Sequence, residues 1–305
     1  MGITPEEFNK NVEDMRVEMK HLKSEVRKAY NKLSKQQATE ALIHEAVEEA
    51  LKGVKVSASP NLKTKEKRPK SSKNTPEAWL CLSDWQVGKV TETYNSQIAA
   101  RRVHQLTNQA ADLLRKEKPK VLHIILQGDM VEGEAIFAGQ PFEIDDDLWT
   151  QSVKTVPQLI THVITKLSPL VPKIKVACVH GNHGKNMEWD ISETWFVKQK
   201  VAGNGIVCVH GDQIAGGTPF NVGAIFKKAM GWKLLIEDWK FLSVGHYHTH
   251  ASGELNKDAY FFLSGSTETD NEFARERLAQ GGLALQRLCF FNRKGLISEH
   301  LLKLN

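Results

Sequence analysis

The sequence has little of what marks a secreted, disulfide-stabilised or membrane protein. Only four of its 305 residues are cysteines, and no two of them form a Cys-x-x-Cys pair (Cys81, Cys178, Cys208 and Cys289). Each lies in an apolar run, so we expect buried free thiols in a reducing cytoplasm. No run of about eighteen apolar residues is present, which argues against a membrane-spanning helix. The first residues are polar and acidic, unlike a secretory signal.

Most of the chain also has no strong excess of positively charged side chains. The net charge is +5 over 305 residues. Residues 1–53 hold nine basic and ten acidic side chains, and residues 54–76 hold seven and one, so residues 77–305 are neutral overall. A nucleic-acid groove should carry a basic surplus, so composition argues against a strongly basic groove in this large C-terminal part.

Residues 1–53 carry the pattern of two helices. Thr4, Pro5 and Glu7 form the start of the first, and a second capping box begins at Ser34. Apolar or small side chains recur in the first helix at spacings of four and three (Phe8, Val12, Met15, Met19, Leu22, Val26, Ala29 and Leu33). One helix cannot bury so narrow an apolar stripe by itself, so the stripe must pack against another helix. The pattern therefore predicts a helical hairpin or coiled coil that makes the protein a homo-oligomer.

A helix-turn-helix-like DNA-binding head is the alternative for this segment. The second helix of a DNA reader should offer basic side chains, but here it carries four glutamates (Glu40, Glu45, Glu48 and Glu49), which favours oligomerisation. Residues 54–76 are rich in Lys, Ser and Pro and predict a basic flexible linker. The remaining residues, 77–305, are then one large domain.

This large domain alternates short apolar runs with helical patterns. The runs are AWLCLS, VLHIILQ, IKVACV, GIVCVH, KFLSVG, AYFFLS, LALQRLCFF and GLISEHLL. Helical patterns lie around 95–117 and 148–168, and we expect helices at 192–202 and 220–230 as well. Runs separated by helices predict α/β layering, and the closely spaced runs at the end predict hairpins.

Polar, metal-capable residues follow five of these runs. The groups are Asp84-Trp85-Gln86, Gln127-Gly128-Asp129, His180-Gly181-Asn182-His183, His210-Gly211-Asp212 and Gly245-His246-Tyr247-His248. Ligands bind at the carboxyl ends of strands in α/β sheets. One such residue alone is weak evidence, but five in order predict a site where these strand ends meet.

In this order the groups resemble the calcineurin-like metallophosphoesterase superfamily. Within it, the motifs favour the phage and bacterial, DNA-repair-exonuclease-like branch. The superfamily pattern is Asp-x-His, Gly-Asp, Gly-Asn-His, His, then Gly-His-x-His, and the match covers about residues 78–250. Two positions depart from it: Gln86 stands where a histidine is usual, and Gly184 where many members carry Asp or Glu. The resemblance implies an α/β fold, a two-sheet β-sandwich flanked by helices, with two metal ions at one edge.

The resemblance also implies a role for each residue. Asp129 would bridge both metals. Asp84, Gln86 and His248 would complete the first metal site, and Asn182, His210 and His246 the second. His183 would bind no metal but would face the scissile phosphate and assist the leaving oxygen.

This residue set suits phosphoester hydrolysis on chemical grounds. Two metal ions about 3.5–4 Å apart lower the pKa of a water between them and stabilise charge on the attacking and leaving oxygens. Mixed imidazole, carboxylate and amide ligands suit Mn²⁺, Fe or Zn²⁺ rather than a purely oxygen-loving ion. We expect two divalent ions, Mn²⁺ first, with Mg²⁺, Fe or Zn²⁺ as alternatives. Gln86 replaces an imidazole nitrogen by an amide oxygen at unchanged charge, so we expect a weaker first site that prefers harder ions such as Mn²⁺ or Mg²⁺.

The expected function is hydrolysis of phosphodiester bonds, in DNA, RNA or nucleotides, by a cytoplasmic enzyme. The alternatives are a phosphomonoesterase or protein phosphatase, and a catalytically weak metal-binding assembly protein. Retention of His183 argues against the last, because a purely structural metal site has no chemical need for it.

Neighbouring residues carry weaker expectations. Glu132 and Asp212 could orient ligands, while Trp85 and Tyr247 could stack on a base or simply pack. The long 130–150 segment could set substrate choice. Within it, the run Asp145-Asp146-Asp147 more naturally caps the next helix than binds metal.

Overall fold

The computed structural model describes residues 75–134, 136, 139–183, 195–214, 221–269 and 283–305. The chain divides into two compact units, residues 1–63 and 64–305, and every described residue belongs to the second. The helices expected in residues 1–53 and nearly all of the 54–76 linker lie outside the described residues, so the homo-oligomer stays a prediction. No helix in the described part of the chain is both long and apolar enough to cross a membrane.

The domain is built on two mixed sheets of five strands each. The first has the order β10-β9-β1-β2-β3 and the second β4-β5-β6-β8-β7. The strands are β1 (Glu77–Leu82), β2 (Leu122–Gln127), β3 (Ile174–Val179), β4 (Phe196–Val201), β5 (Asn204–Val209), β6 (Phe241–Val244), β7 (Ala251–Asn256), β8 (Ala259–Leu263), β9 (Leu285–Asn292) and β10 (Gly295–Lys303). β1, β2 and β3 run parallel, as do β5, β6 and β8.

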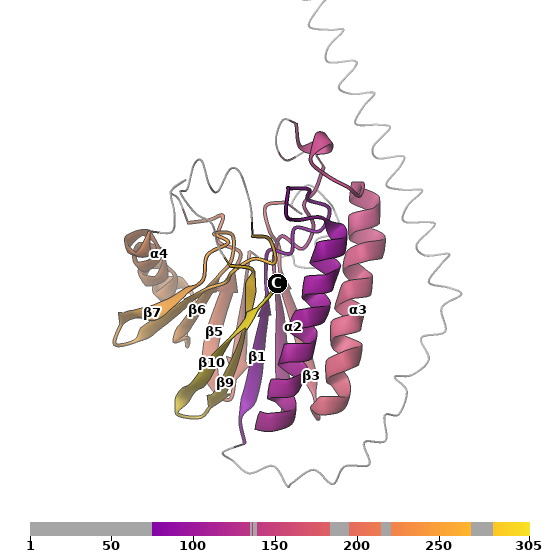
Figure 1. Cartoon of the computed structure of the whole chain (residues 1–305). Coiled ribbons are helices and arrows are strands. Elements are labelled where there is room, and N and C mark those ends of the chain that lie inside the picture. The colour runs from indigo at the N-terminus through magenta and orange to yellow at the C-terminus, as the bar shows by residue number, and fades with distance from the viewer. Residues whose placement is uncertain (1–74, 135, 137–138, 184–194, 215–220, 270–282) are drawn as a thin grey trace, which may run out of the picture. The chain divides into compact units, whose positions relative to one another are not determined.

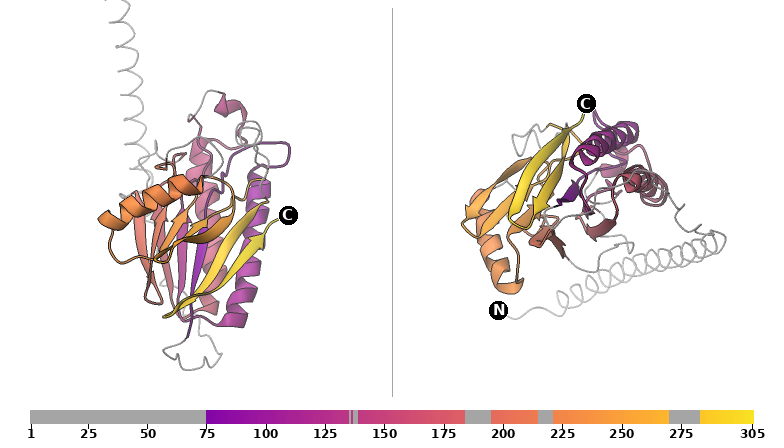
Figure 2. Two further views of the ribbon diagram at one scale, coloured as in Figure 1. Left: turned by 90° about the vertical axis from the view of Figure 1, so that its left-hand side faces the viewer. Right: turned by 90° about the horizontal axis from the view of Figure 1, so that it is seen from below.

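Among the described residues, three α-helices cover the sheets: α2 (Ser96–Glu117), α3 (Val156–Leu167) and α4 (Val222–Leu235). The Asn95 side chain accepts a hydrogen bond from the Ile98 amide and begins α2, and Asn221 caps α4 in the same way. A π-helical turn (Thr150–Thr155) leads into α3, and short 3₁₀ turns lie at Gln140–Phe142 and Ser168–Leu170. α2 and α3 lie side by side on the outer face of the first sheet, and α4 lies on the far side of the second (Figures 1 and 2).

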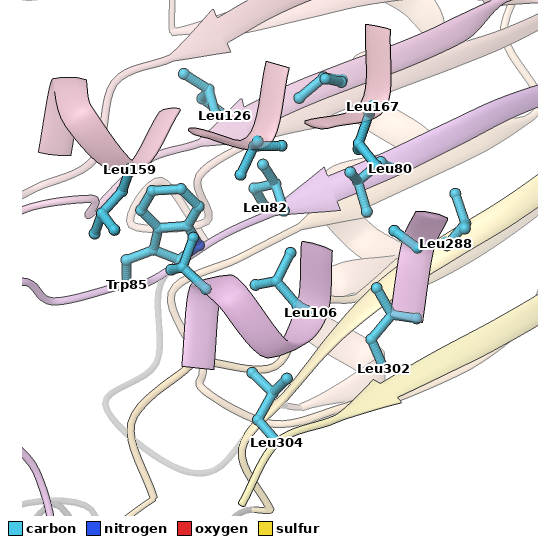
Figure 3. Packing of buried hydrophobic residues seen from close by; sticks show 14 of the residues in the cluster. Leu80, Leu82, Trp85, Leu106, Leu126, Leu159, Leu167, Leu288, Leu302 and Leu304 are labelled. Atoms are coloured by element: carbon cyan, nitrogen blue, oxygen red, sulfur yellow. The ribbon is translucent and has the colours of Figure 1, made fainter. Parts of the chain in front are cut away.

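The alternation of side chains along β1 explains the layers. Leu80 and Leu82 point to the helices and join a core with Leu106 and Leu159, which Figure 3 shows. Their neighbours Trp79 and Cys81 point the other way, into the layer between the two sheets. Since strand side chains alternate in direction, a run that is apolar on both sides must be covered on both faces. The predicted two-sheet sandwich flanked by helices is therefore confirmed.

The sequence patterns located most elements correctly. Each of the eight apolar runs contains a strand, and the helices expected around 95–117, 148–168 and 220–230 are present with shifted ends. The helix expected at 192–202 is wrong, because residues 196–201 form β4, an edge strand paired with β5. Burial alternates along its second half, where Gln199 and Val201 are buried while Lys198 and Lys200 are exposed, which is the strand period. β7 (Ala251–Asn256), which is polar, was not anticipated.

The four cysteines are free, as predicted. Cys81, Cys208 and Cys289 are buried in the layer between the sheets, while Cys178 is half-buried. Burial raises the pKa of the Cys81 thiol to about 11, so it stays protonated near neutral pH. Its sulfur contacts the Gln127 amide oxygen at 2.7 Å, which also accepts from the Ser243 hydroxyl at 2.7 Å. This buried network joins β1, β2 and β6.

Candidate metal centre

All five polar groups of the sequence meet at one end of the sandwich. They follow β1, β2 and β3 in the first sheet and β5 and β6 in the second, at the carboxyl ends of these parallel strands. This is the end where ligands are expected in α/β sheets. The eight residues predicted for metal binding and catalysis form a single network of contacts (Asp84, Gln86, Asp129, Asn182, His183, His210, His246 and His248).

The backbone at this end is strained. Among the described residues, eight that are not glycine have a positive φ, and five of these are predicted ligands (Asp84, Gln86, Asp129, His246 and His248). Their φ angles lie between 48° and 70°. L-residues rarely adopt this region, and such conformations concentrate at functional sites. The strain is an indicator of function that does not depend on the sequence motifs.

Three potential ligands converge most tightly. The donor atoms of Asp129, His210 and His246 all lie within 4.8 Å of one another. His210 Nε2 lies 3.0 Å from Asp129 Oδ2 and 3.0 Å from Asn182 Oδ1. Nε2 carries at most one hydrogen, and a cation that accepts lone pairs from the nitrogen and both oxygens would satisfy all three atoms at this spacing.

The other ring nitrogen of His210 fixes how the imidazole is used. Nδ1 lies 3.0 Å from the main-chain oxygen of Gln127, which can only accept a hydrogen bond. Nδ1 therefore carries the hydrogen, and Nε2 of the neutral ring offers a lone pair to the centre. Metal-binding histidines are usually oriented in this way by a partner on the far nitrogen.

A second group lies beside the first. His248 Nε2 lies 3.3 Å from Asp84 Oδ1, and the His246 main-chain amide donates to the same carboxylate at 3.1–3.2 Å. Gln86 adjoins the first group, because its Nε2 lies 3.4 Å from Asp129 Oδ2. The Gln86 Oε1 is buried and has no hydrogen-bond partner in the described part of the chain. A half-turn of the amide would bring this oxygen beside Asp129, where a shared cation would satisfy both.

Glycine is required where the loops approach each other most closely. A Cβ atom on Gly181 would lie 2.0 Å from Asp129 Oδ1 and 2.3 Å from its main-chain nitrogen. No side chain fits there, because real Cβ atoms do not approach so closely. Gly181 thus allows the loop after β3 to reach Asp129, and the His183 amide then donates to Asp129 Oδ1 at 2.9 Å.

The charges of the centre couple strongly in the metal-free protein. Burial alone would raise the pKa of Asp129, but the charges of and hydrogen bonds from His210 and His183 lower it well below its usual range. Burial would likewise lower the pKa of His210, yet Asp129 raises it to about 9. For His248, burial is overcome by Asp84 and Glu268, which raise its pKa to about 10. Burial and the neighbouring His210 lower the pKa of His246.

His183 is held apart from this group of ligands. Its Nδ1 lies 2.6 Å from the main-chain oxygen of Glu132 and 3.6 Å from the Glu132 carboxylate. Nδ1 therefore donates to the Glu132 main-chain oxygen, which leaves Nε2 as the ring nitrogen for a ligand. Burial raises the pKa of Glu132. The expectation that Glu132 orients a neighbouring residue agrees with these contacts, and the residue it orients is His183.

Glu268 is a component that the sequence patterns did not reveal. Its carboxylate lies 3.2 Å from His248 Nδ1 and 3.1 Å from the Lys89 ammonium, and it is buried. Glu268 belongs to the loop after β8 that begins at Ser264, and the Ser266 hydroxyl donates to the Asp84 main-chain oxygen at 2.7 Å. The run AYFFLS is also followed by polar residues, so the strand-end rule could have identified this loop.

The remaining neighbours have structural roles. Trp85 and Tyr247 are buried, so packing rather than base stacking describes them. Asp145 accepts hydrogen bonds from the Ser96 amide and hydroxyl at the start of α2, at 2.8 and 2.6 Å, and Asp147 accepts from the Thr150 amide at 2.7 Å. The aspartate run therefore caps helical turns, as predicted, although Asp145 caps the preceding helix rather than the following one.

Comparison with known proteins gives matches only at the level of structure. No family model matches the chain, and no curated protein sequence matches it. A phosphoesterase of E. coli, YfcE, matches with a TM-score of 0.37 and 13% identity over 74% of this chain and 99% of its own. A dimetal phosphatase from Danio rerio matches with a TM-score of 0.40 and 9% identity over 76% and 100%. Vps29 from Chaetomium thermophilum gives 0.39 and 10% over 76% and 97%.

Removing the charge of Glu268 should weaken metal binding. Glu268→Gln takes away the carboxylate that fixes His248 Nδ1 and makes Nε2 a stronger donor, so Mn²⁺ affinity should fall about 10–100-fold. Isothermal titration calorimetry without substrate measures this, and Glu254→Gln, an exposed change on β7, is the matched control. Equal affinity in the two variants would show that Glu268 does not support His248.

Metal binding should release protons. At pH 7 the metal-free protein holds His210 and His248 protonated, because their pKa values are about 9 and 10. Metal ligation needs the neutral imidazole, so Mn²⁺ affinity should rise from pH 7 to pH 9. Calorimetric titrations at pH 7 in two buffers of different ionisation enthalpy should give different observed enthalpies. Identical enthalpies would contradict this, and a His210→Gln, His248→Gln double variant should release fewer protons.

Proposed function

We propose that this protein is a metal-dependent phosphoesterase with a dinuclear centre, of the calcineurin-like type that its motifs resemble. The observation that carries the proposal is the convergence of Asp129, His210 and His246 donor atoms within 4.8 Å, with Asn182 3.0 Å from His210. Asp84, Gln86 and His248 adjoin this group through Asp129 and the His246 amide. Mn²⁺ fits this mixture of oxygen and nitrogen donors best.

The donor set fits two divalent ions. Asp129 offers two carboxylate oxygens, one towards His210 and Gln86 and the other towards the His183 amide. Asn182, His210 and His246 would hold one ion, and Asp84, Gln86 and His248 the other, with Asp129 between them. When bound, the ions would supply a water of lowered pKa and neutralise charge on the phosphoryl oxygens.

The chain's own residues would supply orientation and a proton. The Gln127 carbonyl and the Glu268 carboxylate hold the two ligand imidazoles with Nε2 facing inwards. Glu132 holds His183 so that its Nε2 points outwards, where a protonated ring can donate to the leaving oxygen of a phosphoester. Lys89, which is largely buried, neutralises Glu268 at 3.1 Å and keeps that carboxylate in place.

For the substrate we propose a phosphodiester of nucleic acid or nucleotides. The resemblance to repair-exonuclease motifs supports this choice. A phosphomonoester or phosphoprotein substrate is the alternative, and hydrolysis rates on single- and double-stranded DNA, RNA, cyclic dinucleotides and p-nitrophenyl phosphate separate them. A metal-binding assembly protein is the non-enzymatic alternative, but it would leave the oriented His183–Glu132 pair without a purpose.

His183→Ala should abolish turnover while leaving the metals bound. Loss of a general acid typically costs about 10²–10⁴-fold in rate. Hydrolysis of bis-p-nitrophenyl phosphate with Mn²⁺ measures the rate, and calorimetry measures Mn²⁺ affinity, which should stay near that of the parent. His104→Ala, at an exposed position on α2, is the control. Absence of turnover by the parent protein on every phosphoester, with any divalent metal, would overturn the enzymatic proposal.

Gln86→His should tighten the first metal site and shift its preference towards Zn²⁺ or Fe. The substitution replaces an amide oxygen by an imidazole nitrogen next to Asp129 and adds no charge. Competition titrations of Mn²⁺ against Zn²⁺ in the parent and the variant test this. If neither affinity nor selectivity changes, Gln86 is not a ligand.

A further inference from the structure

Two glutamines on the chain between β2 and α3 are completely buried. Gln140 and Gln151 are both 0% exposed. Gln140 lies in the 3₁₀ turn at Gln140–Phe142, and Gln151 lies in the π-helical turn that leads into α3. Burying an amide is costly unless its oxygen and its N–H groups find hydrogen-bond partners. Neither glutamine belongs to the motifs that predict metal ligands, so their burial needs another explanation.

Gln140 is bound to Glu132, the residue that contacts His183. Its Nε2 donates to the Glu132 main-chain oxygen at 2.8 Å and to the Glu132 carboxylate at 3.1 Å. Its Oε1 accepts a hydrogen bond from the Ile136 amide at 2.7 Å. The oxygen and both N–H groups of the Gln140 side chain are therefore used, and two of these three hydrogen bonds end on Glu132.

Gln151 is bound to the next residue along the chain, Gly133. Its Oε1 accepts a hydrogen bond from the Gly133 amide at 2.9 Å. Its Nε2 donates to the Asp146 main-chain oxygen at 2.8 Å and to the Gly133 oxygen at 3.3 Å. The loop after β1 leaves room for this side chain, because a Cβ atom on Gly88 would lie 2.3 Å from Gln151 Nε2. Gln151 therefore needs a glycine at position 88.

The two glutamines hold one and the same peptide group. The Glu132 carbonyl and the Gly133 N–H belong to the peptide bond between these residues, and a peptide group is planar. Gln140 binds its oxygen and Gln151 binds its N–H. The same oxygen lies 2.6 Å from His183 Nδ1, and its two lone pairs can accept from both donors. The orientation of this peptide plane therefore decides whether His183 Nδ1 has an acceptor.

We propose that Gln140 and Gln151 are positioning residues for His183. They fix the Glu132–Gly133 peptide so that its oxygen keeps the imidazole in the Nδ1–H form, with Nε2 available to the substrate. This inference rests on the proposed role of His183 as the proton donor to the leaving oxygen. In the described part of the chain, neither glutamine side chain hydrogen-bonds to a predicted metal ligand, so metal binding should not depend on them. A small misplacement of a reacting group is enough to slow a reaction strongly.

The first test reads the state of His183 without any turnover. NMR spectra of the full-length, metal-free protein with ¹⁵N-labelled histidine, at a pH where the ring is neutral, show which ring nitrogen carries the hydrogen. The spectrum of His183→Ala assigns the signal. The parent should show the Nδ1–H form, while Gln140→Met and Gln151→Met should show a mixture of both tautomers. The matched control is Gln199→Met, which removes another buried amide, one that accepts from the Trp79 indole at 3.0 Å, and should resemble the parent.

The second test measures kcat on two diesters that differ in the leaving group. Diphenyl phosphate releases a more basic oxygen than bis-p-nitrophenyl phosphate and so depends more on a proton donor. With Gln140→Met, kcat for diphenyl phosphate should fall about tenfold or more, which is part of the about 10²–10⁴-fold that a general acid supplies, and kcat for bis-p-nitrophenyl phosphate should fall less. KM and Mn²⁺ affinity should stay near those of the parent. If the parent hydrolyses only monoesters, phenyl phosphate and p-nitrophenyl phosphate replace the diesters.

A double variant shows whether Gln140 acts through His183. Residues that act as one unit are not additive, so Gln140→Met should not slow the residual turnover of His183→Ala any further. A purely structural role for Gln140 would instead lower the rate by the same factor in both backgrounds.

Three outcomes would overturn the proposal. His183 could keep the Nδ1–H form in both glutamine variants, Gln140→Met could slow both substrates equally, or its effect could persist in the His183→Ala background. Absence of turnover by the parent would contradict the proposed function instead. In that case the NMR spectra would still decide whether the two glutamines position His183.

Discussion

The structure depends on one buried repulsion, between the lone pairs of an imidazole nitrogen and two oxygen atoms. Asp129 and Asn182 each place an oxygen 3.0 Å from His210 Nε2, in a cluster where Asp129 and His210 are buried. Donor atoms this close repel one another unless a proton or a cation lies between them. In the metal-free protein a proton on His210 relieves the repulsion, which is why its pKa rises to about 9 despite burial. A divalent ion would relieve it more fully.

The surrounding backbone is strained where it holds these atoms close together. The ligand loops adopt left-handed backbone conformations at Asp84 and Asp129. The absence of a side chain at Gly181 allows the loop after β3 to contact Asp129. Beneath them the Gln127 amide joins β1, β2, β5 and β6 through buried hydrogen bonds. Strained loops persist only on a rigid base, and the two apolar layers on either side of the first sheet supply it.

The sequence alone determined eight of the ten described strands, their order along the chain and the residues at their ends. Apolar runs are local features of the sequence, so eight strands could be located from them. The polar groups after five of these strands converge, as expected for the carboxyl ends of strands in α/β sheets. Assignment from side-chain spacing failed for β4. This segment is short, and its sequence suits a helix or a strand equally until its pairing with β5 is known. Only the tertiary structure decided which partner each side chain meets. That Glu268 supports His248 and that Glu132 orients His183 follow from contacts between segments distant in the sequence. Such contacts depend on sheet order and loop path, which no local pattern encodes.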